Sequence, residues 1–227
     1  MSKTIVVTGA SRGIGYELIQ LLANAGHTVV ALSRKREPMI ALGHARITAI
    51  STDLTQSKSI DDAATEILSN HDRVDVLIHN AGMLVNKPFA AITAEDFQQC
   101  YQVNVFGVAA LTQALMPAFH AQSHVVAISS MGGIQGSAKF PGLAAYSSAK
   151  AAVITLFELL AEEYKESGPK FNTLALGAVQ TEMLAEAFPG YEAPLNAAEM
   201  AAYIADFGLT GHKYYNGKVL EVSVSTP

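Results

Sequence analysis

Short apolar runs rich in β-branched residues alternate with helix-like segments along the whole chain, and this alternation limits the possible folds more than any other feature. The runs expected to form strands cover residues 4–9, 27–33, 46–51, 73–82, 124–130, 170–177 and 218–224. Apolar residues at helical spacing predict helices over 14–25, 60–68, 93–115, 145–165 and 197–207. Strands that alternate with helices predict a parallel sheet covered by helices on both faces.

The length and composition of the chain fit one such sheet domain. The chain has 227 residues, of which 50% are apolar and 15% are charged, so it can bury a sizeable core. No repeat, low-complexity tract or linker interrupts the alternation. We therefore expect a single doubly wound α/β domain over residues 1–227.

Charge and targeting signals exclude several classes of function. The net charge is −5, and the nearest approach to a basic cluster is Arg-Lys-Arg at 34–36, so a nucleic-acid surface is not expected. No apolar run approaches the roughly 20 residues needed to cross a bilayer. The first ten residues, MSKTIVVTGA, run directly into the first predicted strand and do not resemble a signal peptide.

The few potential metal-binding and disulfide-forming residues favour a reduced protein without a metal. Cys100 is the only cysteine, so no internal disulfide can form, which fits the cytoplasm. His120 and His124 have HxxxH spacing, but no cysteine or acidic residue stands beside them. We interpret them as two loop histidines and expect no metal site.

The first predicted strand runs through the glycine-rich turn TGASRGIG (8–15) into a helix. Gly9, Gly13 and Gly15 stand where the chain must turn sharply and where a phosphate can approach the backbone at a helix N-terminus. Such a turn alone can also be a tight strand–helix connection. Its place at the start of an alternating chain favours dinucleotide binding.

The residues after the second predicted strand indicate which dinucleotide binds. An acidic residue there binds the ribose hydroxyls of NAD, but this chain has Ser33 and Arg34, with Arg12 close by in the glycine turn. A hydroxyl and two guanidinium groups suit a 2′-phosphate. We therefore expect NADP(H) to be preferred over NAD(H); the alternative is that Arg34 is an ordinary solvated charge.

Tyr146 and Lys150 in AAYSSAK (144–150) lie one helical turn apart at the start of a predicted helix. One interpretation is a surface tyrosine that packs on a lysine stem. The other is a phenol whose acidity is tuned by the neighbouring ammonium group.

The glycine turn, HNAG at 79–82 and YSSAK at 146–150 together resemble the classical short-chain dehydrogenase/reductase family, over essentially the whole chain. The resemblance implies a Rossmann-type fold and an NADP(H)-dependent oxidoreductase. With the residues already discussed, the positions expected to bind the cofactor are Gly9, Ser11, Arg12, Gly13, Ile14, Gly15, Ser33, Arg34, Asp53, Leu54, Asn80, Ala81, Gly82, Tyr146, Lys150, Gly177, Val179 and Thr181.

The resemblance also implies a catalytic set of Asn104, Ser130, Tyr146 and Lys150. When a hydride reaches a carbonyl carbon, charge develops on the oxygen, and Tyr146 would supply the proton. A free phenol has a pKa of about 10, which Lys150 and the positive nicotinamide ring would lower. Ser130 would donate a hydrogen bond to the carbonyl oxygen, and Asn104, interrupting its helix, would position a water that returns protons through Lys150.

Several positions depart from the family pattern. His79 replaces an asparagine, and we expect a satisfied core histidine. Ser129 and Ser130 are adjacent, and we assign the catalytic role to Ser130. Between Ser130 and Tyr146 the chain is longer than in most relatives, with SAKF (137–140) as the extra residues. Leu176 replaces the usual proline after the sixth strand.

The segment expected on the substrate side, about 182–195, is short. Its apolar residues either form a small lid over the substrate or only pack against the rest of the protein; they are Met183, Leu184, Phe188 and Tyr191. The shortness of the segment predicts a more open and less selective pocket than a longer lid would make, and Lys139 in the preceding loop is expected to be solvated.

The leading prediction is reduction of a carbonyl, or oxidation of a secondary alcohol, with a small-molecule substrate that the sequence does not identify. The alternatives are a catalytically inactive NADP(H)-binding sensor or partner subunit and, among enzymes, a 3-oxoacyl-thioester reductase. A homodimer or homotetramer is expected, packed through the helices predicted at 93–115 and 145–165.

Overall fold

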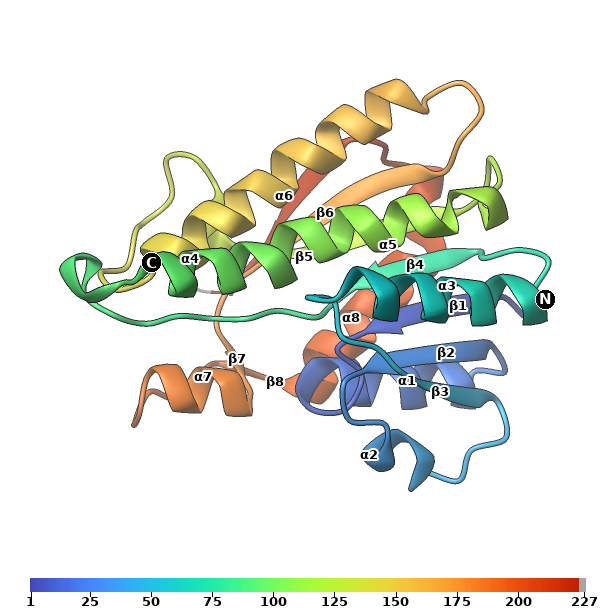
Figure 1. The fold of residues 1–227 in the computed structure, drawn as a ribbon, viewed down its shortest axis with the longest axis horizontal. Helices are drawn as coiled ribbons and strands as arrows, with labels where there is room; N and C mark the ends of the chain where they lie inside the picture. The colour runs from blue at the N-terminus through green and yellow to red at the C-terminus, as the bar shows by residue number, and fades with distance from the viewer. Residues whose placement is uncertain (225–227) are drawn as a thin grey trace.

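Seven parallel strands form one sheet in the order β3-β2-β1-β4-β5-β6-β9 (Figure 1). The structure, a computed structural model, describes residues 1–224. The strands are β1 (Thr4–Thr8), β2 (Thr28–Ser33), β3 (Ile47–Ser51), β4 (Val76–His79), β5 (His124–Ser130), β6 (Lys170–Leu176) and β9 (Lys218–Val222). β1 pairs with β2 on one side and β4 on the other, so the winding direction of the sheet reverses there. The fold is the predicted Rossmann type.

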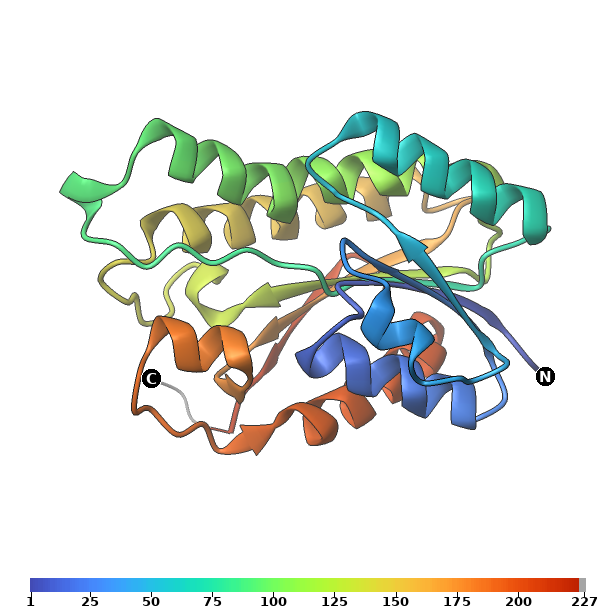
Figure 2. The same ribbon diagram turned by 60° about the horizontal axis from the view of Figure 1, so that its bottom comes forward.

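Helices cover both faces of the sheet (Figure 2). α1 (Gly13–Asn24) and α8 (Ala197–Thr210) pack on one face, and α3 (Ser57–Asn70), α5 (Gly107–Leu115) and α6 (Ala144–Glu163) pack on the other. Each strand supplies alternate side chains to the two layers, so Val7 packs with α1 while Val6 packs with α3 and α5. This explains why the strands are apolar on both sides.

All seven predicted strands and all five predicted helices are present, but the helix predicted at 93–115 is not continuous. It consists of α4 (Ala94–Tyr101), a π-helical turn (Gln102–Phe106) and α5. The sequence did not predict α2 (Glu37–Ile40), α7 (Glu182–Ala187), or the short parallel pair of β7 (Val179–Gln180) and β8 (Leu195–Asn196). Segments of two to six residues carry too little periodicity to be recognised.

Helix α6 is long and apolar enough, by length and composition, to cross a membrane, which the sequence analysis did not anticipate. Core helices of water-soluble proteins meet the same criterion. Val153, Phe157 and Ala161 lie on the face of α6 that packs against the sheet in the core. This helix therefore gives only weak evidence for a membrane.

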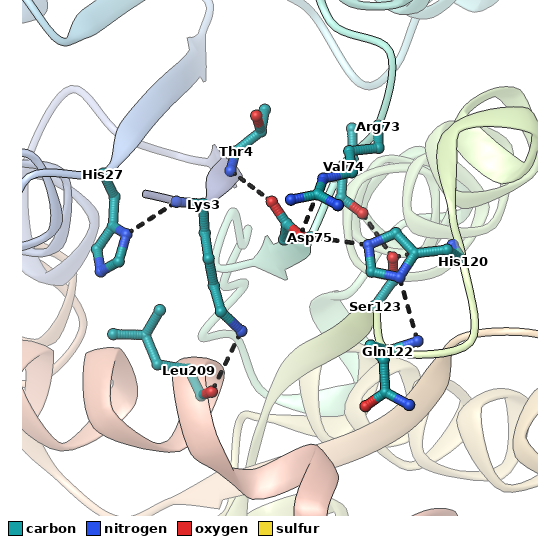
Figure 3. Close-up of polar contacts among 10 residues, drawn as sticks. All are labelled: Lys3, Thr4, His27, Arg73, Val74, Asp75, His120, Gln122, Ser123 and Leu209. Carbon is teal, nitrogen blue, oxygen red and sulfur yellow. Dashed lines mark hydrogen bonds and ion pairs between the residues drawn. The ribbon is translucent and has the colours of Figure 1, made fainter. Parts of the chain in front are cut away.

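The amino ends of the central strands are held by a polar network around Asp75 (Figure 3). The buried Asp75 carboxylate accepts a hydrogen bond of 2.8 Å from the backbone N–H of Thr4. It also contacts His120 Nε2 at 3.2 Å and Arg73 Nε at 3.5 Å. Nearby, Lys3 Nζ donates to the carbonyl of Leu209 in the last turn of α8, where the helix dipole favours a cation.

The two histidines of the HxxxH pair serve this end of the sheet separately. His120 contacts Asp75, whereas His124 is the first residue of β5 and is fully buried, so describing it as a loop residue was wrong. His124 Nδ1 donates to the carbonyl of Gly208 at 3.0 Å, and its Nε2 accepts from Asn172 Nδ2 at 3.0 Å. These partners hold the ring in one neutral tautomer, and burial lowers the pKa of His124 from 6.5 to about 4.

We predict that the protein loses stability as the pH falls from about 6.5 to about 4. His124 in the unfolded chain binds a proton near pH 6.5, but in the folded protein only near pH 4. The unfolded state therefore takes up more protons in this window, and the free energy of unfolding drops by about 3 kcal/mol from this residue. Urea denaturation across the pH range measures the drop.

The variant His124→Gln isolates this contribution. It removes the titrating ring while His79, whose pKa burial lowers to about 3, remains in both proteins. The stability of the variant should depend less steeply on pH between about 6.5 and 4. Equal slopes for the two proteins would contradict the assignment.

Candidate functional site

A cleft of about 900 Å³ opens at the carboxyl ends of the strands, where the winding of the sheet reverses. Nearly all of the residues predicted to form the site line this cleft. The two exceptions are Gly15, which lies beneath the glycine turn, and Asn104, which is buried. The separate connections after β1, β2, β3, β4, β5 and β6 thus contribute to one cavity.

The glycine turn packs against the end of β4 without room for side chains. Gly9 has φ +69°, and a Cβ on it would lie 2.7 Å from Ala81 Cα. A Cβ on Gly15 would lie 2.3 Å from the carbonyl oxygen of Gly9. Asn80 Nδ2 donates to the carbonyls of Thr8 and Gly9 at 3.1 and 3.2 Å, which holds the turn in place.

This geometry fits a dinucleotide pyrophosphate. The cap residue of α1, Arg12, makes no capping hydrogen bond with its side chain, so the first N–H groups of the helix face the cleft without a side-chain acceptor. Backbone N–H groups at a helix N-terminus bind phosphate oxygens. The glycine turn and α1 would therefore hold the pyrophosphate.

On the ribose side, the hydroxyl of Ser33 donates to Ser11 Oγ at 2.8 Å, and Arg34 lines the cleft as an exposed side chain. Arg12, which was predicted to bind the 2′-phosphate, forms ion pairs within the protein. Its guanidinium contacts Glu182 at 2.9 Å and Glu186 at 3.4 Å on α7, and the bond to Glu182 raises the pKa of Arg12. The two carboxylates, 170 and 174 residues away in sequence, were not anticipated.

Asp53 was predicted to contact adenine, and it lines the same part of the cleft. One of its oxygens, Oδ1, accepts hydrogen bonds from the N–H and the hydroxyl of Thr55 at 2.9 and 2.8 Å. The side chain is thus oriented by its own turn.

Ser130, Tyr146 and Lys150 meet at the other end of the cleft. Ser130 lies near enough to Tyr146 for its side chain to lower the pKa of the phenol. Lys150 Nζ lies 5.7 Å from the centre of the Tyr146 ring and donates to the carbonyl of Ile128 at 2.7 Å. The enlarged loop between Ser130 and Tyr146 therefore does not separate them.

The adjacent serines have different partners, as expected for neighbours on a strand. Ser129 Oγ is buried and donates to the backbone carbonyl of Lys150 at 2.8 Å. Ser130 faces the cleft and accepts from the N–H of Gly132 at 3.3 Å. Ser129 therefore bonds to the backbone, and Ser130 is the serine that reaches the cleft.

The acidity of the pair is set by burial when only the protein's own side chains surround it. Burial raises the pKa of Tyr146 to about 12, the Cys100 thiol adds to this rise, and the hydrogen bond from Ser130 opposes it. Burial also lowers the pKa of Lys150 to about 8. The side chains of the protein alone therefore do not give Tyr146 the lowered pKa that was expected from Lys150.

Asn104 lies in the π-helical turn, and its side chain binds the segment after β4. Its Nδ2 donates to the carbonyls of Met83 and Cys100 at 2.8 Å each, and its Oδ1 accepts from the Met83 N–H at 3.3 Å. A Cβ on Gly82 would lie 3.4 Å from Asn104 Oδ1 and 3.6 Å from Lys150 Nζ. The glycine thus keeps open the space between the amide and the ammonium group.

Cys100 was not predicted to take part in the site. Its thiol is buried below Asn104 and donates to the carbonyl of Met83 at 3.4 Å. Only the helical spacing of four residues before Asn104 could have indicated this contact.

His79 is a core residue, as expected. Contrary to expectation, only one of its two ring nitrogens has a hydrogen-bond partner among the described residues. Its Nε2 contacts Thr112 Oγ1 at 2.8 Å, and its ring packs edge-on against Phe157. Its Nδ1 has no hydrogen-bond partner within residues 1–224.

The connection after β6 carries the remaining predicted residues. Gly177 N–H donates to the carbonyl of Val222, Val179 pairs with Leu195 in the short β7–β8 ladder, and Thr181 caps α7 by accepting from the Leu184 N–H at 3.2 Å. Leu176 closes β6 as a buried residue in place of the proline.

The two serines yield a stability test. Ser129→Ala should lower the free energy of unfolding by about 1 kcal/mol, because the carbonyl of Lys150 loses a buried donor. Ser130→Ala is the matched control, and it should change stability by less than about 0.5 kcal/mol because Ser130 is partly open to the cleft. Chemical denaturation measures both; a larger loss for Ser130→Ala would contradict the assignment.

Known proteins resemble this chain in sequence and structure. The family described as short chain dehydrogenase matches residues 3–192. Oxidoreductase BOA17 of Botryotinia fuckeliana is 32% identical over 188 residues, which are 80% of this chain and 68% of that protein. A solved short chain dehydrogenase from Salmonella enterica serovar Typhi is 28% identical, has a TM-score of 0.87 and covers 97% of this chain and 96% of that one. A 3-ketoacyl-(acyl-carrier-protein) reductase from Brucella melitensis, solved with NADH, shares the fold at a TM-score of 0.87 and 24% identity, with 97% of this chain and 96% of that chain covered. The chain therefore belongs to the short-chain dehydrogenase family of oxidoreductases.

Proposed function

We propose that the protein is an NADP(H)-dependent oxidoreductase that interconverts carbonyl compounds and secondary alcohols, with Tyr146 as proton donor and acceptor. The observation that carries the proposal is the meeting of Ser130, Tyr146 and Lys150 in the cleft that the glycine turn closes at its other end. A dinucleotide and a substrate can thus share one cavity.

The nicotinamide cofactor supplies or accepts the hydride. The protein controls the proton. Tyr146 donates its phenolic proton to the oxygen of the carbonyl, and Ser130 donates a hydrogen bond to the same oxygen as its negative charge develops. Because the pKa of Tyr146 is raised to about 12, mainly by burial, the phenol is protonated at neutral pH, as a donor must be.

Lys150 has two roles in this proposal. Its ammonium group lies beneath the Tyr146 ring and stabilises the phenolate left after proton transfer. With a pKa of about 8 it can also pass a proton near neutral pH. The space beside Gly82, between Lys150 and Asn104, supports the proposed water that returns this proton.

The preference for NADP(H) rests on Ser33 and Arg34 beside the ribose end of the cleft, where no acidic side chain follows β2. Arg34 is free of any ion pair with the described residues, whereas Arg12 contacts Glu182 and Glu186. We therefore assign the larger part of 2′-phosphate recognition to Arg34.

Tyr146→Phe should lower kcat for carbonyl reduction by at least about 10³-fold, because no other hydroxyl in the site can replace the proton donor and positioned acid catalysis is worth about 10²–10⁴-fold. Affinity for NADPH should stay within about twofold. Steady-state kinetics over a panel of ketones and aldehydes gives kcat, and NADPH fluorescence gives the affinity.

The same panel tests the inactive alternative. A cofactor-binding sensor would bind NADPH but reduce none of the carbonyl compounds. If instead Tyr146→Phe retained most of the rate, the protein would be an enzyme with a different proton donor.

In the double variant Ser33→Asp, Arg34→Gln, the value of kcat/KM with NADPH divided by that with NADH should fall by about 10²-fold. The variant removes a charge-assisted contact and places a carboxylate next to the 2′-phosphate. Lys35→Gln, an exposed neighbour that does not line the cleft, is the control for a general charge effect. An unchanged ratio in the double variant would show that the phosphate binds elsewhere.

A further inference from the structure

The end of the cleft beyond Tyr146 is bounded by apolar side chains from three separate segments. These are the segment after β4, the enlarged loop between β5 and α6, and α7 with the residues that follow it. The side chains are Leu84, Phe140, Leu143, Met183, Phe188 and Tyr191. We propose, on the basis of the proposed function, that this region selects uncharged carbonyl compounds with an extended apolar substituent, and that Phe140 is a specificity-determining residue.

The enlarged loop between Ser130 and Tyr146 forms part of the wall of the cleft, in addition to the short 182–195 segment. The N–H of Lys87 donates to the carbonyl of Gly142 at 3.0 Å, so the loop is fastened to the segment after β4. Gly142 has φ +90°, and a Cβ there would lie 2.1 Å from Asn86 Oδ1, so the close approach of the two segments requires glycine.

Asn86 joins this wall to α7. Its Nδ2 donates to the carbonyl of Ala187, the last residue of α7, at 2.8 Å. The three segments therefore form a connected rim around the substrate end of the cleft. The shortness of 182–195 is thus accompanied by walls from two other segments, which the sequence did not show.

The charges that line the cleft exclude anionic substrates. Arg34 and Asp53 lie at the ribose and adenine end, and Lys150 Nζ is bound to the carbonyl of Ile128. Arg12 is already paired with both Glu182 and Glu186. Among the described lining residues, no cation remains to meet a substrate carboxylate or phosphate, and the two glutamates outnumber the single arginine.

This balance among the lining residues argues against the 3-oxoacyl-thioester alternative, although Lys139, next to Phe140, is exposed and makes no ion pair with a described residue. Coenzyme A and acyl-carrier thioesters carry phosphate groups, which basic residues near the pocket mouth would have to bind. An uncharged ketone needs only the hydroxyls of Ser130 and Tyr146 for its oxygen, together with an apolar surface for its chain.

Phe140 presents such a surface. It lines the cleft while 40% of its surface stays exposed, and Tyr191, which follows α7 and also lines the cleft, is 48% exposed. A bound alkyl chain would cover this apolar area. Burying one methylene contributes about 0.8 kcal/mol, which corresponds to a factor of about three to four in kcat/KM.

The test compares two series of substrates at saturating NADPH. For methyl ketones from butan-2-one to octan-2-one, kcat/KM should rise about threefold for each added methylene. The acid 7-oxooctanoate has the same chain length and the same methyl ketone as octan-2-one, but it ends in a carboxylate. Its kcat/KM should be at least about tenfold lower, because the carboxylate would lose water without gaining a cationic partner.

Phe140→Ala should flatten the dependence on chain length. We expect about a tenfold loss of kcat/KM for octan-2-one, mainly through KM, and a change below about twofold for butan-2-one. Phe89→Ala is the matched control, since Phe89 is 73% exposed and does not line the cleft. It should leave both substrates unaffected.

The outcomes separate this inference from the proposed function. Reduction of 7-oxooctanoate as efficiently as octan-2-one, a flat chain-length series, or equal effects of Phe140→Ala and Phe89→Ala would overturn the inference while leaving a carbonyl reductase. Failure to reduce any carbonyl compound, ketone or aldehyde, despite NADPH binding would overturn both.

Discussion

Two hydrogen bonds between the start of α6 and the end of β5 fix the position of the reactive side chains. Ser129 Oγ donates to the carbonyl of Lys150, and Lys150 Nζ donates back to the carbonyl of Ile128. Further along α6, Val153 and Phe157 are buried in the core, so the helix cannot rotate without exposing them. Tyr146, one turn before Lys150, is thereby held against Ser130. The arrangement of Ser130, Tyr146 and Lys150 in the cleft depends on this attachment, whereas Asn104 is held separately by Met83 and Cys100.

The sheet separates two chemically different ends. At the carboxyl ends of the strands, glycine turns and the N-terminus of α1 leave backbone N–H groups facing the cleft, which suits an anionic cofactor. At the amino ends, Lys3 and His124 donate to carbonyls in the last turns of α8. These two donors are thus used in hydrogen bonds within the fold and are not available to a ligand. This explains why the HxxxH pair has no part in the proposed chemistry.

Sequence patterns were sufficient for the sheet and for the reactive pair, because both are encoded locally. The strands were recognised as continuous apolar runs, and Tyr146 and Lys150 lie within one helical turn. The contacts that shape the substrate end were beyond such patterns. Arg12 meets Glu182 across 170 residues, and Asn86 meets Ala187 across 101. The sequence also shows the lysine near Tyr146 but not the loss of water around the phenol, which raises its pKa in the protein without cofactor.

The short segment after β4 ties together two walls that come from distant parts of the chain. Asn86 Nδ2 donates to the carbonyl of Ala187 at the end of α7, and the backbone N–H of the next residue, Lys87, donates to the carbonyl of Gly142 in the loop before α6. An outward movement of either wall would therefore strain the same two residues. A substitution in one wall would for this reason also be felt in the other, so the two walls should be mutated together as well as singly.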